Sequence, residues 1–301
     1  MVRIVLLSIC IYFPLLVSGQ FKGQIKAADD QAPVPFVNIW IKGEYKGTSA
    51  NQQGYFSLPV HTGDTLVLSS VGFEKLEFVV GTLVSDTVNL LMKKQAVVLD
   101  EVAVMGNRNA KGRRYTIDKI DKWKIRSFIG TGGVPIMYGF VIEQEEVLMA
   151  GMGIKSVSFV TKSEKVPSTV LIRLYEKGTD GLPGNSLHTT PILVECKRGK
   201  HITTVDVEQM NLSFPSNGLI VAIELLCIEE NTIEITVTDA RGPGKPEKIK
   251  RKHINPYIGT SDSHQQNTLV YSKGDWYLLA RENFPPQVGL KSIPFRLELK
   301  D

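Results

Sequence analysis

The sequence predicts an all-β protein with two sandwich domains in tandem, and three observations lead to this prediction. From Gln20 onward the apolar residues recur with a period of two, which is the spacing of β-strands and not of helices. Turn residues interrupt the first domain about every 8–12 residues, a pattern typical of antiparallel sandwiches. The chain has 301 residues, which is enough for two separate cores.

The composition excludes several classes of protein. Hydrophobic residues make up 43% and charged residues 22%, as in ordinary globular proteins. The net charge of +4 is too small over this length to indicate a nucleic-acid partner. No nucleic acid is therefore expected to bind.

Residues 1–19 have the layout of a signal peptide. Arg3 supplies a charged start, residues 4–17 are mostly apolar but short for a bilayer span, and Ser18 and Gly19 are small. The alternative is an uncleaved anchor. A signal peptide would direct export to the periplasm or cell surface of a Gram-negative bacterium, and its cleavage would leave no transmembrane segment.

Residues 20–106 are predicted to form a seven-stranded, immunoglobulin- or prealbumin-like sandwich. In residues 36–41, the side chains of Val37, Ile39 and Ile41 share one face, and those of Phe36 and Trp40 the other. Further strands are expected at 55–58, 65–69, 76–80, 87–91 and 102–104.

A tight hairpin is expected between the strands at 36–41 and 55–58. Gly47 and Gly54 would bracket it with positive φ angles, and the Asn51 side chain would bond its own backbone to shape the turn. These three residues are predicted to be structural.

Several motifs of this domain resemble the carboxypeptidase regulatory-like family. They are G-Q-I at 23–25, P-F-V-N-I at 35–39, G-T-S-A-N-Q-Q-G-Y-F-S-L at 47–58, S-V-G-F at 70–73 and L-D-E-V-A-V at 99–104. The resemblance implies a non-catalytic, prealbumin-like sandwich. Such domains lie beside the catalytic part of carboxypeptidases and precede the body of outer-membrane nutrient receptors.

Residues 107–126 are predicted to be a basic linker with a helical tail. One reading is a strip for anionic glycans or lipid head groups. The other is a solvated connector in which Ile117, Ile120 and Trp123 dock one helical turn onto a domain.

Residues 127–301 are predicted to form a jelly-roll-like β-sandwich. Strands are expected at 137–142, 157–160, 170–175, 192–195, 203–207, 219–226, 233–237, 268–271, 276–279 and 295–299. The stretch R-L-Y-E at 173–176 and the following turn-rich loop resemble jelly-roll accessory modules of bacterial surface proteins. Residues 239–267, rich in Gly, Pro and Lys, are expected to be a mobile loop or a binding loop.

Cysteine usage leaves two alternatives after export. Cys196 and Cys227 could form one disulfide across the second domain, or remain two buried thiols.

The motifs of common catalytic sites are missing. None of the five histidines has the neighbours of a zinc carboxypeptidase site, so no metal and no cofactor is expected. No G-x-S-x-G elbow or phosphate loop is present. The sequence therefore predicts a non-enzyme. The alternative is a hydrolase whose carboxylates, for example Glu143 and Glu145, converge only in the folded second domain.

Aromatic residues are the best candidates for ligand contacts. Tyr257, Trp276 and Tyr277 could stack on a glycan. The alternative is that Trp276 belongs to the core, with Tyr277 on the opposite face of the same strand. The predicted function is an exported, non-enzymatic binding or scaffold protein of the bacterial envelope, whose partner is a glycan or an envelope protein. The narrower alternative is a carbohydrate-binding accessory protein of a nutrient-uptake system.

Overall fold

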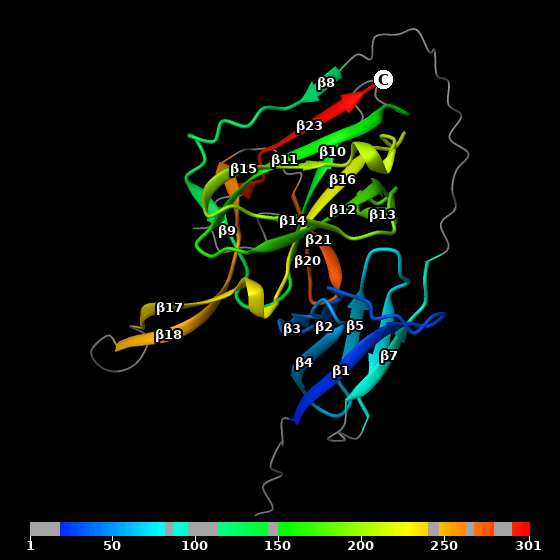
Figure 1. Ribbon diagram of the computed structural model, residues 1–301, viewed down its shortest axis with the longest axis vertical. Coiled ribbons are helices and arrows are strands. Elements are labelled where there is room, and N and C mark those ends of the chain that lie inside the picture. The colour runs from blue at the N-terminus through cyan, green and yellow to red at the C-terminus, as the bar shows by residue number, and fades with distance from the viewer. Residues whose placement is uncertain are drawn as a thin grey trace, which may run out of the picture.

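The computed structural model is an all-β protein in which a smaller N-terminal sandwich lies against a larger C-terminal one (Figure 1). It describes residues 19–81, 87–95, 114–143, 150–239, 247–262, 268–279 and 291–301. The predicted signal peptide, apart from Gly19, and the motif at 99–104 lie outside these residues.

The described part of the first domain contains seven strands. They are β1 (Gly19–Ala27), β2 (Asn38–Ile41), β3 (Gly47–Ser49), β4 (Tyr55–Val60), β5 (Thr65–Ser69), β6 (Leu76–Val79) and β7 (Val88–Met92). One of them, at Gly47–Ser49, was expected to be part of a turn, and the strand expected at 102–104 lies outside the described residues. One sheet has the order β4-β1-β7 and the other β3-β2-β5-β6. Their inner faces enclose a core that includes Ile25, Ile39 and Leu68.

The turn that was expected to be a hairpin instead joins the two sheets, since β3 and β4 belong to different sheets. Asn51 performs its predicted role: its Oδ1 accepts hydrogen bonds from the backbone N–H groups of Gln53 (3.0 Å) and Tyr55 (2.9 Å). Gly54 has the expected positive φ of 76°. The positive φ expected for Gly47 is wrong. A Cβ there would lie 2.5 Å from the Ile39 carbonyl, so close packing, not turn geometry, requires the glycine.

The second domain consists of two facing antiparallel sheets. One has the order β13-β12-β16-β10-β20-β21, with β14 also paired to β12; the other has the order β22-β19-β11-β23-β8, with β15 paired to β11 and β9 to β19. The strands not yet bounded are β8 (Arg114–Ile117), β9 (Ser127–Ile129), β10 (Met137–Ile142), β11 (Gly153–Ser163), β12 (Thr169–Lys177), β13 (Pro183–Ser186), β14 (Ile192–Glu195), β15 (Gly199–Asp206), β16 (Leu219–Leu225), β17 (Thr232–Asp239), β18 (Glu247–Ile254), β19 (Tyr257–Asp262), β20 (Thr268–Ser272), β21 (Asp275–Leu278), β22 (Lys291–Ser292) and β23 (Phe295–Lys300). Two 3₁₀ turns, Glu208–Met210 and Glu229–Asn231, are the helical elements among the described residues.

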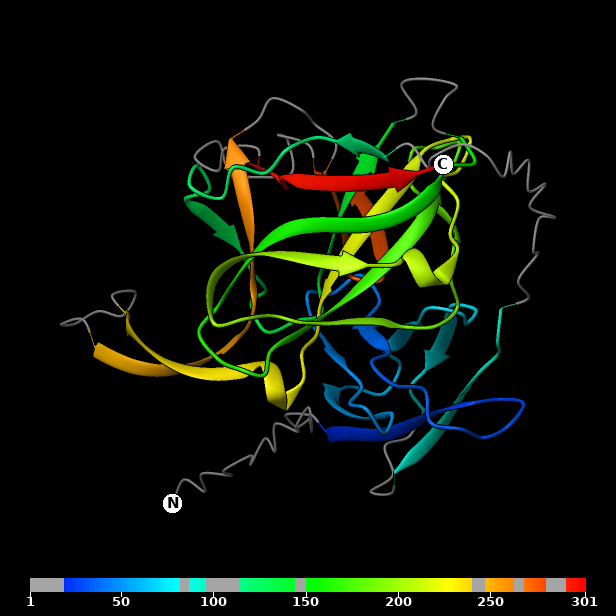
Figure 2. The ribbon, with the colours of Figure 1, turned by 45° about the horizontal axis from the view of Figure 1, so that its top comes forward.

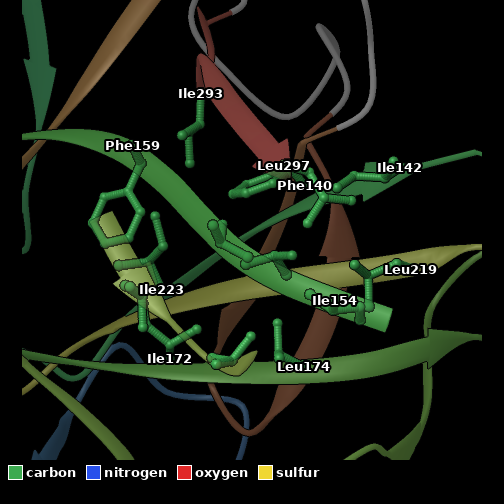
Figure 3. Close-up of a cluster of buried hydrophobic side chains, with 14 of the residues drawn as sticks. Phe140, Ile142, Ile154, Phe159, Ile172, Leu174, Leu219, Ile223, Ile293 and Leu297 are labelled. Atoms are coloured by element: carbon green, nitrogen blue, oxygen red, sulfur yellow. The ribbon is translucent and has the colours of Figure 1, made fainter. Parts of the chain in front are cut away.

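The core of the second domain lies between these two sheets. Ile172 and Ile223 reach it from one sheet, and Phe159 and Leu297 from the other (Figure 3). Alternate residues of the first sheet therefore point away from this core, which leaves its outer face to be covered by something else.

The helical tail expected in the linker is wrong. Arg114–Ile117 forms β8 and pairs antiparallel with β23, so this part of the predicted linker belongs to the second domain. Trp123 does not dock, because it is 78% exposed.

The loop expected at 239–267 is also wrong for the residues that the structure describes. β17 and β18 form an antiparallel hairpin that projects away from both sandwiches (Figure 2). β19 then returns the chain to the second domain.

Cys196 and Cys227 are free thiols in this structure. Burial raises the pKa of each thiol to about 12. Of the two alternatives, the structure thus has the pair of unlinked thiols.

Candidate functional site

The outer face of the larger domain is covered by the first domain, through residues on the outer face of β2. Trp40 is fully buried against Val134, Ile136, Met137 and Tyr271. The side-chain alternation predicted for this strand is therefore confirmed, and its second apolar face is a domain interface.

A second apolar cluster continues this interface. Phe36 and Val71 of the first domain pack with Leu171, Leu226 and Ile228 of the second. Burying each large apolar side chain contributes about 1.5–3 kcal/mol. The two clusters together hold the sandwiches as one body.

A buried polar network runs through the same interface. Arg173 and Glu224 are 2% and 0% exposed, with Nη2 of the arginine 2.6 Å and Nε 2.8 Å from Oε2 of the glutamate. The other carboxylate oxygen, Oε1, accepts a hydrogen bond from Nδ2 of Asn38 (2.7 Å). Arg173 also donates to the Ser69 hydroxyl (3.0 Å) and carbonyl (3.3 Å). Two residues of each domain therefore share one set of bonds.

Arg173 remains charged despite its burial. Burial is the largest single effect and would lower the pKa of Arg173, but the combined effects of Glu224 and Tyr175 outweigh it and raise that pKa. Both carboxylate oxygens of Glu224 are bonded, so this buried acid has a structural role. A buried pair of this kind is tolerated only when its remaining polar atoms also find partners.

A pocket of about 460 Å³ opens beside this network, with walls from both domains. This volume lies in the range of about 300–1,000 Å³ that is typical of small-molecule sites. Its lining includes Val71 and Lys75 from the first domain and Arg173, Tyr175, Tyr271 and Trp276 from the second.

Three aromatic rings form one wall of the pocket. The Trp276 ring centroid lies 5.3 Å from that of Tyr271 and 6.4 Å from that of Tyr175, the latter pair edge to face. Strand pairing explains the arrangement, since Tyr271 of β20 is the direct partner of Trp276 of β21.

The tight turn between β20 and β21, next to these aromatic rings, contacts the first domain. Lys273 and Gly274 both have positive φ, 56° and 91°, as a two-residue hairpin turn requires. Lys75 of the first domain donates to the Gly274 carbonyl (2.8 Å) and pairs with Asp275 (3.0 Å). The side chains of Lys75 and Asp275 are 44% and 58% exposed, so this pair marks the rim of the pocket.

The Tyr271 hydroxyl is the unusual group in the pocket lining. Tyr271 is buried, and its Oη has no hydrogen-bond partner among the described residues. An unsatisfied buried hydroxyl costs about 1–3 kcal/mol. Burial also raises the pKa of Tyr271, so the group remains a proton donor at neutral pH.

A second hollow, of about 680 Å³, lies on another part of the domain boundary. Its lining includes Lys22, Asn51 and Tyr55 of the first domain and Cys227 and Lys252 of the second. The raised pKa of the Cys227 thiol, caused by burial, makes it a poor nucleophile there.

The structure brings one of the three predicted ligand-contact residues to the first pocket. Trp276 is half-buried: it lines the pocket and also packs against the apolar cluster that contains Trp40. Tyr277, the next residue of β21, is 43% exposed and is absent from the pocket lining. Tyr257 lies in the opposite sheet, where its ring packs against Gly130 and its hydroxyl lies 3.3 Å from Nδ1 of His253.

The pocket residues that the sequence did not indicate are Lys75, Arg173, Tyr175 and Tyr271. A charged residue in the middle of an apolar strand was the available signal, since Arg173 interrupts the run from Val170 to Leu174.

Metal-binding chemistry has no visible scaffold in the described ranges. They contain no group of three or more His, Cys, Asp or Glu side chains that could hold a metal ion. His188 is engaged on both ring nitrogens: Nε2 accepts from the Leu174 N–H (3.1 Å) and Nδ1 donates to the Thr190 carbonyl (2.7 Å). The same ranges contain no helix with the length and apolar character needed to cross a bilayer.

Comparison with known proteins identifies the first domain. Residues 21–104 match the model of the CarboxypepD_reg-like domain family, which confirms the resemblance inferred from the motifs. This match covers the first sandwich.

Two curated proteins share a short segment with this chain. The TonB-dependent receptor SusC of Bacteroides thetaiotaomicron is 32% identical over 95 residues, which are 32% of this chain and 9% of the receptor. The TonB-dependent receptor P26 of Formosa agariphila is 38% identical over 73 residues, 24% of this chain and 7% of the receptor. The matched segments thus span less than a tenth of either relative.

Among solved structures, a structure of the infectious bursal disease virus Gx strain aligns with 88% of this chain and 56% of its own. Its sequence identity is 13% and its TM-score 0.23, which is too low to indicate a common fold.

Proposed function

We propose that this protein is an exported, non-enzymatic binding protein of the Gram-negative cell envelope. Its two sandwiches act as one rigid body that presents the pocket between them. The signal-peptide layout of residues 1–19 supports export. The regulatory-like domain and the similarity to segments of TonB-dependent receptors support a place in the envelope.

One observation carries the binding role, namely that the pocket exists only where the two domains meet. Its first-domain wall includes Val71 and Lys75, and its second-domain wall includes Tyr175 and Trp276. The buried bonds of Ser69 to Arg173 and of Asn38 to Glu224 hold these walls in register. A pocket held by a pre-formed interface needs little ordering when a ligand enters, which favours affinity.

The acidic residues support a non-catalytic role. Glu224 has both oxygens bonded within the interface. Glu143, a candidate acid of the alternative hydrolase, pairs with Lys177 at 2.6 Å and is about half exposed. The other candidate, Glu145, lies outside the described residues. A general acid with a raised pKa usually needs a less solvated carboxyl group.

The proposal is tested with residues 20–301 and two variants of adjacent residues. Trp276→Ala removes a pocket wall, and Tyr277→Ala removes an exposed ring of the same strand. Binding to arrays of glycans and peptides should be lost in the first variant and retained in the second. Hydrolysis of a panel of glycosides and peptides that stops on changing one acidic residue would replace the proposal with the hydrolase alternative. Fractionation of cells that express the full chain tests the location; an unprocessed, cytoplasmic product would contradict export.

A narrower candidate is a carbohydrate-binding accessory protein of a nutrient-uptake system. The aromatic wall of Tyr175, Tyr271 and Trp276 favours it, since flat rings beside polar groups suit sugar rings. In a host that carries the gene, its deletion should slow growth on a polysaccharide and leave growth on the free monosaccharide unchanged. Equal growth of the mutant and its parent on every polysaccharide tested would argue against an uptake role.

A further inference from the structure

The chemistry of the interdomain pocket is specific enough to indicate a class of ligand. Its charged side chains carry both signs, with Lys75 and Arg173 opposed by Glu74 and Asp275. The charge of Arg173 is already neutralised by Glu224, and its guanidinium also donates a hydrogen bond to Ser69. Lys75 is likewise paired with Asp275, so both cations of the lining have counter-ions and the pocket has no free cation with which to attract an anionic ligand.

The remaining polar groups suit a ligand whose groups both donate and accept hydrogen bonds. Asp275 and Glu74 can accept, Lys75 can donate, and the Ser70 hydroxyl can do either. The Ser186 hydroxyl donates to the His188 carbonyl (2.7 Å) and can still accept. Sugar hydroxyls have this dual capacity. Peptide side chains and phosphates offer it much less often.

The apolar part of the pocket suits the C–H face of a sugar ring. The C–H face of a pyranose ring packs on a flat aromatic surface, and Trp276 offers one at the wall, held by Tyr271 and Tyr175. The Tyr271 hydroxyl beneath this wall has no partner among the described residues, so a ligand oxygen would supply one.

From these observations we infer that the interdomain pocket binds a neutral mono- or disaccharide, with Trp276 as the stacking platform and the Tyr271 hydroxyl as a donor to the sugar. Lys75 and Asp275 bond to ring hydroxyls at the rim. This inference rests on the proposed binding function and specifies its ligand.

Tyr271→Phe separates ligand binding from a structural role. In the free protein it removes a hydroxyl that has no bond to lose, so the melting temperature should stay unchanged or rise. In the complex it removes one donor, so affinity for the sugar should fall about 3- to 10-fold. A purely structural tyrosine would show no loss of affinity.

The experiment measures binding of residues 20–301 to three arrays: neutral oligosaccharides, uronic-acid or sulfated oligosaccharides, and peptides. Isothermal titration with the best neutral sugar follows. Trp276→Ala should weaken it at least 10-fold, Tyr271→Phe about 3- to 10-fold, and the matched control Tyr277→Ala less than 2-fold.

The outcomes distinguish this inference from the function on which it rests. Trp276-dependent binding of peptides or anionic sugars, with neutral sugars inactive, overturns the ligand class and keeps the binding role. Neutral-sugar binding that Trp276→Ala and Tyr271→Phe leave intact overturns the assignment to this pocket. Absence of binding on all three arrays overturns both.

Discussion

The amide of Asn38 donates a hydrogen bond of 2.7 Å to the carboxylate of Glu224, across the boundary between two domains and with both side chains fully buried. Glu224 in turn holds Arg173 through Oε2. Polar groups seldom lie so deep between domains unless their geometry is maintained, because an unpaired member carries the full penalty of desolvation.

Removal of the glutamate should therefore be severe. Glu224→Ala leaves Arg173 charged and buried without its counter-ion, which should lower the free energy of unfolding by about 3–5 kcal/mol. Urea titration followed by tryptophan fluorescence measures it.

Two variants control this experiment. Glu77→Ala breaks the exposed pair with Lys42 and should cost about 0–1 kcal/mol. The double change Arg173→Met with Glu224→Leu removes both charges and should recover most of the lost stability. A Glu224→Ala protein as stable as Glu77→Ala would show that the network contributes nothing.

Gly72 reports on the closeness of the two domains. It has a φ of 78°, and a Cβ would lie 2.6 Å from the Thr189 carbonyl of the second domain. Gly72→Ala should cost about 1–2 kcal/mol for the backbone conformation and about 1–3 kcal/mol more for the clash. Gly63→Ala is the matched control, since Gly63 has a φ of 93° and no heavy atom within 4 Å of its Cβ position. Equal losses in the two variants would mean that the domains do not touch at Gly72.

His188 should make stability depend on pH. Burial lowers its pKa, the Arg173 charge acts in the same direction, and the bond to the Thr190 carbonyl acts against both. Because the unfolded chain binds this proton more readily, the stability is fully present above the ordinary pKa of about 6.5. It falls as the pH decreases from there to the lowered pKa of the native state.

Urea titrations at several pH values between about 7.5 and 5 measure this dependence. His188→Gln should be less stable than the wild type at pH 7.5 and should lose less stability on acidification. The carboxylates are common to both proteins, so the difference between the slopes isolates the histidine. Parallel curves would contradict the prediction.

The two thiols should be unreactive in the native protein. With pKa values raised to about 12 by burial, Cys196 and Cys227 hold almost no thiolate at pH 8. A thiol reagent should label neither in residues 20–301, and both once guanidinium unfolds the chain without reductant. Labelling that requires a reductant would reveal a disulfide and contradict the free thiols of the structure.

Local patterns predicted the strands well where one side of each strand faces a core. The alternation in residues 36–41 placed Val37 and Trp40 on opposite faces, and the Asn51 turn was predicted from a side chain that bonds its own backbone. The helical tail predicted for the linker was wrong because the three-residue spacing of Ile117, Ile120 and Trp123 is also the spacing of one face of a helix. Pairing of Ile117 with Leu297, 180 residues later, overrides that local preference.

The candidate site was harder to predict, for the same reason. Most of its members come from the end of β5 and the segment after it, and from β12, β13, β20 and β21. These segments lie in two domains, and only the folded protein brings them together. Trp276 was found because aromatic residues are conspicuous. Tyr271 was not, since its unpaired hydroxyl is a property of the packed interior.

Strand β2, which has a buried residue on both faces, also determines which part of this chain could be transferred to another protein. Its odd-numbered side chains belong to the interior of the first sandwich, while Asn38 and Trp40 contact the second domain. Phe36, just before the strand, also contacts the second domain. If the first sandwich were produced alone, the Trp40 ring and the Asn38 amide would be exposed to water. The exposed apolar surface would then favour association with other molecules. The unit that can be transferred to another protein is therefore the pair of sandwiches. A first sandwich that stands alone needs different residues at positions 36, 38 and 40.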